Sequence, residues 1–99
     1  MAKRAAEFEF FHAVDRSTVL QGFVLFRGDQ MLLEIEEPED TPWDIRGKSK
    51  GAFFEGHHKQ RPGDASAYAK WILLEDVYIG LWIEDGQEYL FKFQLHELD

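Results

Sequence analysis

The sequence predicts an all-β fold, an antiparallel meander of six to seven strands that forms a small barrel or a strongly bent half-barrel. Three observations support this prediction. Apolar and polar residues alternate with a period of two along most of the chain, as they do in half-buried strands. Gly-Asp and Asp-Gly dipeptides separate two pairs of alternating runs, which is typical of β-hairpins. Aromatic residues make up 15% of the chain, and they favour strands.

The first predicted strand covers residues 7–14, and the polar residues at 15–17 predict the turn that follows it. Phe8, Phe10 and His12 lie on one face of this strand, because successive side chains point to opposite sides. His12 is therefore a core or rim residue or, if the strands close into a barrel, a polar group that lines a pocket.

Residues 18–26 and 30–36 form the second and third predicted strands, joined by a type II′ turn with Gly28 at its first central position. A two-residue turn pairs apolar residues on one face: Phe26 with Met31, Val24 with Leu33, and Gly22 with Ile35. A slip by one residue would mix the two faces of the hairpin, so the pattern selects this register.

The middle of the chain is less regular. Residues 37–49 are predicted to form a polar loop, and residues 51–59 a fourth strand. Residues 65–75 suit two structures, since their alanines and leucines favour a helix whereas their aromatic and β-branched residues favour a strand. We predict a strand here. The alternative is an α+β fold, in which a helix at about 64–75, capped by Asp64, packs on the meander.

The last hairpin contains Asp85-Gly86 and admits two registers. A two-residue turn pairs Trp82 with Tyr89, whereas a three-residue loop with Gly86 as a bulge pairs Leu81 with Tyr89. We predict the second register, because it gives one nearly all-apolar face. The other face then carries Tyr78, Gly80, Trp82 and Leu90. The predicted core of the whole fold comprises Phe8, Phe10, Leu20, Val24, Phe26, Leu33, Ile35, Ile79, Leu81, Ile83, Phe91 and Phe93.

Length and composition indicate a single β domain over residues 1–99, which buries roughly 65% of its unfolded surface. The sequence has no cysteine, which fits a cytoplasmic location. No apolar run approaches the ~20 residues of a membrane span, and no signal-peptide pattern is present. The formal net charge of −8 argues against nucleic-acid binding and favours basic partners or cationic ligands.

Glu55, His57 and His58 form the densest cluster of titratable residues. In a strand Glu55 and His57 point the same way and His58 points the opposite way, so the two histidines do not share one metal ion. Glu55 and His57 supply two ligands, whereas a catalytic zinc site needs three from the protein. Motifs for nucleophilic, phosphate-binding or zinc-protease chemistry are missing from the sequence. We therefore predict no catalytic residue, metal or cofactor.

Aromatic residues form the candidate contact surfaces. Tyr78, Trp82 and Leu90 fall on the less apolar face of the last hairpin, which either binds a partner or packs within the fold. Trp43 lies in the predicted polar loop, where it either closes one end of the barrel or anchors a partner.

These observations favour a non-enzymatic, acidic binding or interaction protein that forms a homodimer through a sheet edge or the aromatic face and binds a basic protein surface. The alternative is a β-barrel that binds a small cationic or aromatic ligand, with His12 or Glu55 as the polar group. A metal-dependent enzyme that uses Glu55 and His57 is the least favoured function. Neither nucleic acid nor a membrane is an expected partner.

Overall fold

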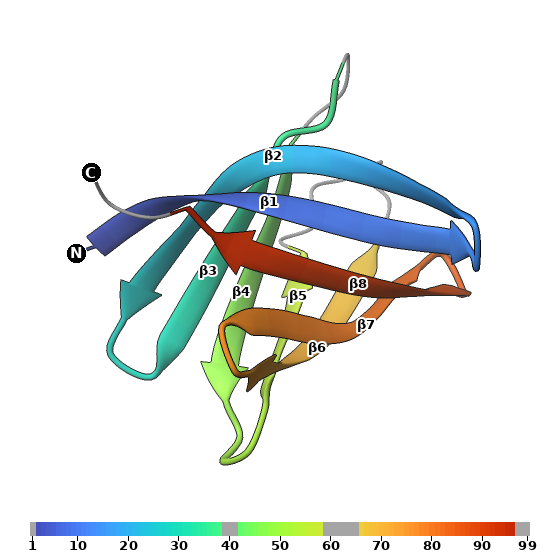
Figure 1. Cartoon of the computed structure of the whole chain (residues 1–99). Coiled ribbons are helices and arrows are strands. Elements are labelled where there is room, and N and C mark those ends of the chain that lie inside the picture. The colour runs from blue at the N-terminus through green and yellow to red at the C-terminus, as the bar shows by residue number, and fades with distance from the viewer. Residues whose placement is uncertain (1, 39–41, 59–65, 97–99) are drawn as a thin grey trace.

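The computed structural model describes residues 2–38, 42–58 and 66–96 and shows eight antiparallel strands that close into a small barrel (Figure 1). Each strand pairs with its neighbours in sequence, and the first pairs with the last. The strands are β1 (Ala2–Ala13), β2 (Arg16–Arg27), β3 (Gln30–Ile35), β4 (Trp43–Ser49), β5 (Phe54–His58), β6 (Ala67–Leu74), β7 (Val77–Glu84) and β8 (Gln87–Leu95). The all-β barrel prediction is confirmed, with eight strands in place of six to seven.

The additional strand is β4, which lies where the sequence predicted a polar loop over 37–49. Its residues do alternate, with Ile45 and Gly47 inside the barrel and charged side chains outside. The alternation of β4 is difficult to detect in the sequence, because one of its two buried positions is Gly47, which has no apolar side chain. Glycine is required there, since a Cβ at this position would collide with the indole ring of Trp71.

The first hairpin also differs from its prediction. β1 begins at Ala2, and the turn lies at Val14–Asp15, one residue before the predicted turn at 15–17. Val14 is fully exposed and belongs to no strand. The pairing of β1 with β2 shifts between Phe11 and Ala13, so a local irregularity surrounds His12.

Two other predictions are confirmed. The β2–β3 hairpin has the predicted register, with Val24 opposite Leu33, and Gly28 has the positive φ that a type II′ turn requires. Residues 67–74 form strand β6, so the helix alternative is wrong. The proposed helix cap, Asp64, lies outside the described residues.

The predicted register of the last hairpin is wrong. Asp85 and Gly86 form a two-residue turn with φ of 49° and 82°, as in a type I′ turn, and Trp82 lies opposite Tyr89. Tyr78 and Trp82 are therefore core residues, at 9% and 2% exposed. The three aliphatic residues of β7 that were predicted for the core are not buried: Ile79, Leu81 and Ile83. Two further predicted core residues, Leu20 and Phe26, are only partly buried.

The physical reason is that β7 buries its aromatic residues and leaves its aliphatic residues outside. Gly80 lies between Tyr78 and Trp82 on the inner face. In the sequence it interrupts the apolar residues of that face, so the face is not recognised as the buried one. A Cβ at Gly80 would collide with the backbone carbonyl of Lys70 on β6, so the close approach of these strands requires glycine. Counting apolar residues on each face therefore selects the wrong face.

Aromatic rings fill the barrel interior. Trp71 is enclosed and donates its indole N–H to the sulfur of Met31 over 3.2 Å. Tyr78 stacks on Phe93 with ring centroids 4.8 Å apart, and burial raises the pKa of its phenol. Seven of the predicted core residues are buried in the structure: Phe8, Phe10, Val24, Leu33, Ile35, Phe91 and Phe93.

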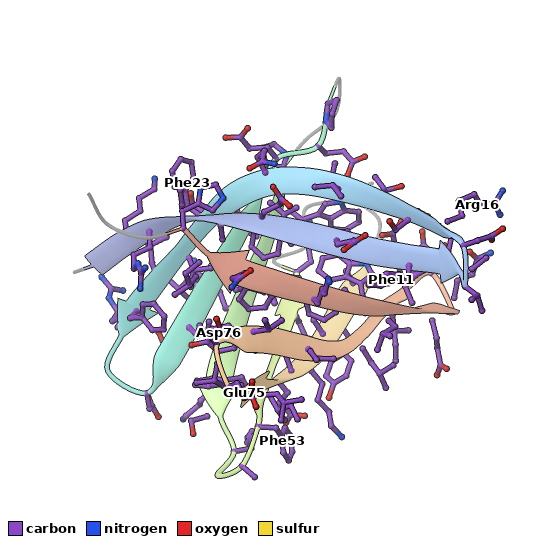
Figure 2. All side chains as sticks on the ribbon, viewed as in Figure 1. Phe11, Arg16, Phe23, Phe53, Glu75 and Asp76 are labelled. Carbon is purple, nitrogen blue, oxygen red and sulfur yellow. The ribbon has the colours of Figure 1, made fainter. Side chains whose placement is uncertain are left out.

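The two ends of the barrel differ. We call the end with the turns at Val14–Asp15 and Asp85–Gly86 the mouth, and the end with the turns at Gly28–Asp29 and Glu75–Asp76 the base. Figure 2 shows Arg16 at the mouth and Asp76 at the base. At the base, Arg4 donates to the carbonyl of His96 over 2.6 Å, and this contact joins the start of β1 to the end of β8.

Candidate functional site

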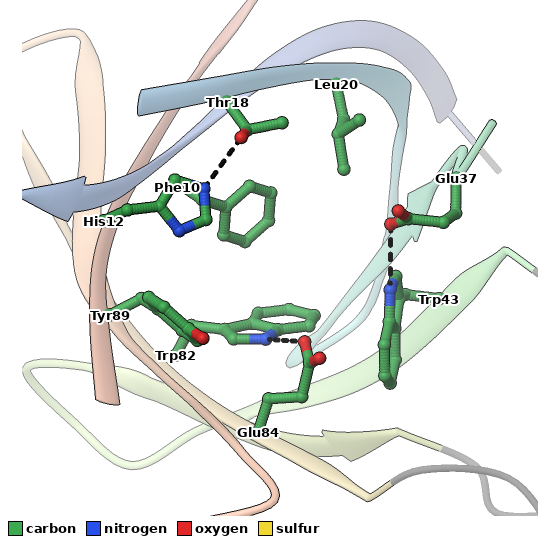
Figure 3. Close-up of a pocket in the computed structure, with 9 residues that line it drawn as sticks. All are labelled: Phe10, His12, Thr18, Leu20, Glu37, Trp43, Trp82, Glu84 and Tyr89. Atoms are coloured by element: carbon green, nitrogen blue, oxygen red, sulfur yellow. Dashed lines mark hydrogen bonds between the residues drawn. The ribbon is translucent and has the colours of Figure 1, made fainter. Parts of the chain in front are cut away.

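A pocket of about 250 Å³ opens at the mouth of the barrel (Figure 3). Its walls are mostly aromatic, and its polar groups include two carboxylates, a histidine and the hydroxyls of Thr18 and Tyr89. The lining residues are Phe10, His12, Thr18, Leu20, Glu37, Trp43, Trp82, Glu84 and Tyr89. The lining is thus divided between aromatic rings and polar groups, and a hollow with polar side chains that converge on it is a common form of a small-molecule site.

Strand alternation brings these side chains together. Phe10 and His12 are the last inward positions of β1, and Thr18 and Leu20 are the first inward positions of β2. Tyr89 and Glu84 occupy the corresponding ends of β8 and β7. The pocket therefore forms where the inner faces of the strands reach the rim and the core aromatics no longer fill the barrel.

Glu84 is held in the pocket by Trp82. The Trp82 Nε1–H donates to Glu84 Oε1 over 3.0 Å, and both side chains project from the inner face of β7. This contact fixes the carboxylate against an indole ring. The second carboxylate oxygen remains as an acceptor for a ligand.

Glu37 is held in a similar way by Trp43. The Trp43 Nε1–H donates to Glu37 Oε2 over 3.3 Å, and this contact joins the segment after β3 to the start of β4. The Trp43 ring meets Trp82 edge-on, with centroids 5.6 Å apart and planes at 90°. The two indoles thus form adjoining walls, and each carries a carboxylate at its N–H (Figure 3).

His12 and Thr18 form the opposite polar wall of the pocket. His12 Nε2 and Thr18 Oγ1 are hydrogen-bonded at 2.7 Å across the β1–β2 hairpin. The imidazole also meets the Tyr89 ring edge-on, with centroids 5.4 Å apart. Figure 3 shows this pair on the far side of the pocket from Glu84.

The mouth carries more acidic than basic residues among those that the structure describes. At or beside its turns and strand ends lie Asp15, Arg16, Glu36, Glu37, Glu84, Asp85 and Glu88. The base is mixed and carries Lys3, Arg4, Arg27, Asp29, Lys50, Glu75 and Asp76. Because acidic residues outnumber basic ones at these described positions, the mouth favours cations over anions.

Three of the residues singled out in the sequence meet in this pocket: His12, Trp43 and Trp82. Tyr78 does not, because it is buried towards the base of the same strand. Leu90 points outward from β8 opposite Leu81 and is 51% exposed. Tyr78, Trp82 and Leu90 therefore do not share a face, which is a consequence of the two-residue turn.

Glu55 and His57 lie on the outer wall of β5, away from the pocket. Both contact Tyr68 on β6. Tyr68 donates to Glu55 Oε2 over 2.7 Å, and the His57 ring lies 5.0 Å from the phenol ring. The hydrogen bond to Glu55 raises the pKa of Tyr68. Across residues 2–38, 42–58 and 66–96, no three His, Cys, Asp or Glu side chains are placed to hold a metal ion.

Glu37, Glu84 and Thr18 were not identified from the sequence as site residues. Glu84 has a detectable signal, because it lies two residues after Trp82 and so shares its face in a strand. Glu37 has none, since it is one of several acidic residues in a segment without alternation. Thr18 was assigned to a strand, but only the closed barrel brings it to a pocket.

No protein-family model matches the chain, and no curated protein matches it in sequence. The part of the chain described by the structure contains no helix long and apolar enough to span a membrane.

Proposed function

We propose that this protein is a non-enzymatic binding protein whose barrel mouth binds an organic cation that carries an ammonium group. The observation that carries the proposal is the pair of carboxylates, Glu37 and Glu84, each held by an indole N–H inside an aromatic-walled pocket. The sequence suggested two kinds of partner, a small cationic or aromatic ligand and a basic protein surface. The pocket favours the small ligand.

The chemistry of the walls supports a cation. An ammonium group gains about 0.5–2 kcal/mol from the face of an aromatic ring, and most from tryptophan. An ammonium group that keeps its N–H bonds also gains about 1.5–3 kcal/mol from a hydrogen bond to a carboxylate. A quaternary ammonium such as that of choline gains only the attraction between opposite charges. Trp43, which is partly exposed, supplies the first kind of contact, and Glu37 and Glu84 supply the second.

The composition of the pocket disfavours an anion. Two carboxylates line it, and the described acidic residues of the rim add to their potential. Arg16 lies on the rim but does not line the pocket. Cations are therefore the ligand class that this charge distribution favours.

Isothermal titration calorimetry with choline tests the proposal, with the uncharged isostere 3,3-dimethyl-1-butanol as the control ligand. We expect choline to bind and the alcohol to bind at least tenfold more weakly, because only choline has the positive charge. The titrations are run at constant ionic strength, since salt screens exposed charges. Equal binding of the two ligands, or no binding of choline, would contradict the proposal.

Two pairs of variants assign the site. Glu84→Gln and Glu37→Gln each remove a charge that lines the pocket, and we expect choline affinity to fall roughly tenfold, or about 1.4 kcal/mol. Glu88→Gln and Glu36→Gln are the matched controls, because they remove the same charge from exposed positions that do not line the pocket. We expect the controls to bind within about twofold of the original protein.

Exposed aliphatic residues on β6–β8 favour a second candidate function, self-association. Leu81 and Leu90 are paired across the hairpin and are 45% and 51% exposed, and Ile72 and Leu74 extend the surface along β6. Contiguous exposed apolar surface is typical of interfaces. Sedimentation equilibrium tests this role: a dimer that Leu81→Lys dissociates supports it, whereas a monomer at high concentration argues against it. Val19→Lys is the control, because Val19 is equally exposed on β2.

A further inference from the structure

The pocket has a second polar element that a simple ammonium ion would not use. Thr18 and His12 are hydrogen-bonded to one another and lie across the pocket from Glu84 (Figure 3). Between these two polar sides the walls are the rings of Phe10, Trp82 and Tyr89. A ligand that contacts everything in the pocket therefore has a charged end, an apolar middle and a hydrogen-bonding end.

The size of the pocket limits the apolar middle. An apolar cavity of about 150 Å³ holds benzene. The pocket at the mouth is about 250 Å³, so it has room for one six-membered ring, a short chain and small polar groups. The edge-on packing of Trp82 against Phe10, at 5.1 Å, leaves an aromatic floor against which such a ring can pack.

We propose that the ligand class is a hydroxylated aryl-alkyl amine, an inference that rests on the function proposed above. Its ammonium group lies between Glu37 and Glu84, and its ring packs against the partly exposed rings of Trp43 and Tyr89. Its hydroxyl group hydrogen-bonds to the Thr18–His12 pair. Both members of that pair can donate or accept hydrogen bonds, so the ligand hydroxyl can act there as a donor or as an acceptor.

Charge excludes a carboxylate as the second polar group. The ligand's carboxylate would lie in a pocket that already contains Glu37 and Glu84, and the rim adds Asp85 and Glu36. Like charges repel more strongly near weakly polar walls than in open solvent. The site should therefore select a primary amine over the corresponding amino acid.

Three ligands test the inference by isothermal titration calorimetry: phenethylamine, tyramine, which adds a hydroxyl to the ring, and L-tyrosine, which adds a carboxylate as well. For the unmodified protein we expect tyramine to bind roughly two- to tenfold more tightly than phenethylamine, as one hydrogen bond provides. We expect L-tyrosine to bind at least tenfold more weakly than tyramine.

Variants locate the hydroxyl contact. Thr18→Val keeps nearly the same side-chain shape, and His12→Phe keeps a ring. In each variant the ratio of tyramine affinity to phenethylamine affinity should fall to about one, while phenethylamine still binds. Ser17→Ala is the matched control. It removes a hydroxyl from the adjacent residue, which points outward and donates to Glu9 over 2.6 Å, so the tyramine preference should persist.

The outcomes separate this inference from the function on which it rests. Equal binding of tyramine and phenethylamine overturns the hydroxyl contact and leaves the cation site standing. A tyramine preference that survives in both Thr18→Val and His12→Phe overturns it equally. Binding of choline without binding of either aryl amine overturns the ligand class alone. Failure of choline and of both amines overturns the ligand class and the proposed function together.

Discussion

Trp82 donates its indole N–H to Glu84 over 3.0 Å, and the two residues occupy successive inward positions of β7. The contact depends on the two-residue turn at Asp85–Gly86, because a three-residue loop would take Glu84 out of strand β7 and away from its inward position beside Trp82. The same turn that fixes the end of the sheet therefore also places a carboxylate in the pocket.

Replacing Trp82 should affect both stability and binding. Trp82→Phe removes part of a buried ring and the hydrogen bond to Glu84, so we expect the free energy of unfolding to fall by about 1–3 kcal/mol. Choline affinity should fall at least threefold, because the N–H that holds the Glu84 carboxylate in the pocket is lost. Trp71→Phe is the control: it lies outside the pocket, so it should lose stability and keep its affinity. Unchanged choline binding in Trp82→Phe would place the cation elsewhere.

Gly80 should not tolerate a side chain. A Cβ there would collide with the carbonyl of Lys70, and backbone atoms cannot move aside as a flexible side chain does. We expect Gly80→Ala to lower the free energy of unfolding in urea by at least about 2 kcal/mol. Leu81→Ala, one residue along on the exposed face, should cost less than about 1 kcal/mol. A Gly80→Ala variant as stable as the original protein would contradict the close approach of β6 and β7.

The β6–β7 turn should be improved by glycine. Glu75 has a φ of 59°, in the left-handed region where a side chain costs about 1–2 kcal/mol. Glycine removes this cost but loses more conformational freedom on folding, so we expect Glu75→Gly to raise the unfolding free energy by up to about 1 kcal/mol. Asp76→Gly is the control and should not stabilise, because it removes the acceptor of the Gln94 side chain. A destabilised Glu75→Gly variant would show that this turn has another conformation.

Stability should decrease in alkaline solution through two tyrosines. Burial raises the pKa of Tyr78, and the hydrogen bond to Glu55 raises that of Tyr68. The folded protein therefore holds these protons more tightly than the unfolded chain. Their contribution is fully present below about pH 10 and is lost as the pH rises through the raised values. Tyr78→Phe and Tyr68→Phe should each flatten the decrease measured by urea unfolding between pH 9 and 11. An identical decrease in both variants would contradict these assignments.

Local alternation was enough to predict much of the barrel. The β2–β3 register follows from apolar pairs such as Val24 with Leu33, because a slip would set Gly22 against Glu34 and mix the two faces. The β7–β8 register could not be predicted in this way, since both faces of β7 carry large apolar residues. What decides it is that Gly80 meets the backbone of β6, a contact between strands that sequence alternation does not contain.

The site was predictable only in its parts. Alternation predicts that His12 shares the face of Phe8 and Phe10, and Trp43 is expected either to close a barrel end or to anchor a partner. Both residues line the pocket. Their meeting with Glu84 depends on closure between β1 and β8, since His12 and Tyr89 come from strands at opposite ends of the chain. Glu37 lies after the end of β3, in a segment without alternation. Its contact with Trp43 could therefore not be predicted from the sequence.

The indole N–H resonances of the three tryptophans provide the most direct test of the cation site. Trp43 and Trp82 donate to the two carboxylates of the pocket, whereas Trp71 donates to Met31 in the core. In ¹H–¹⁵N spectra, assigned with Trp→Phe variants, saturating choline should shift the Trp43 and Trp82 signals and leave Trp71 in place. The neutral isostere 3,3-dimethyl-1-butanol should shift none of them. Stationary Trp43 and Trp82 signals under choline, or equal shifts with the alcohol, would contradict the cation-binding mouth.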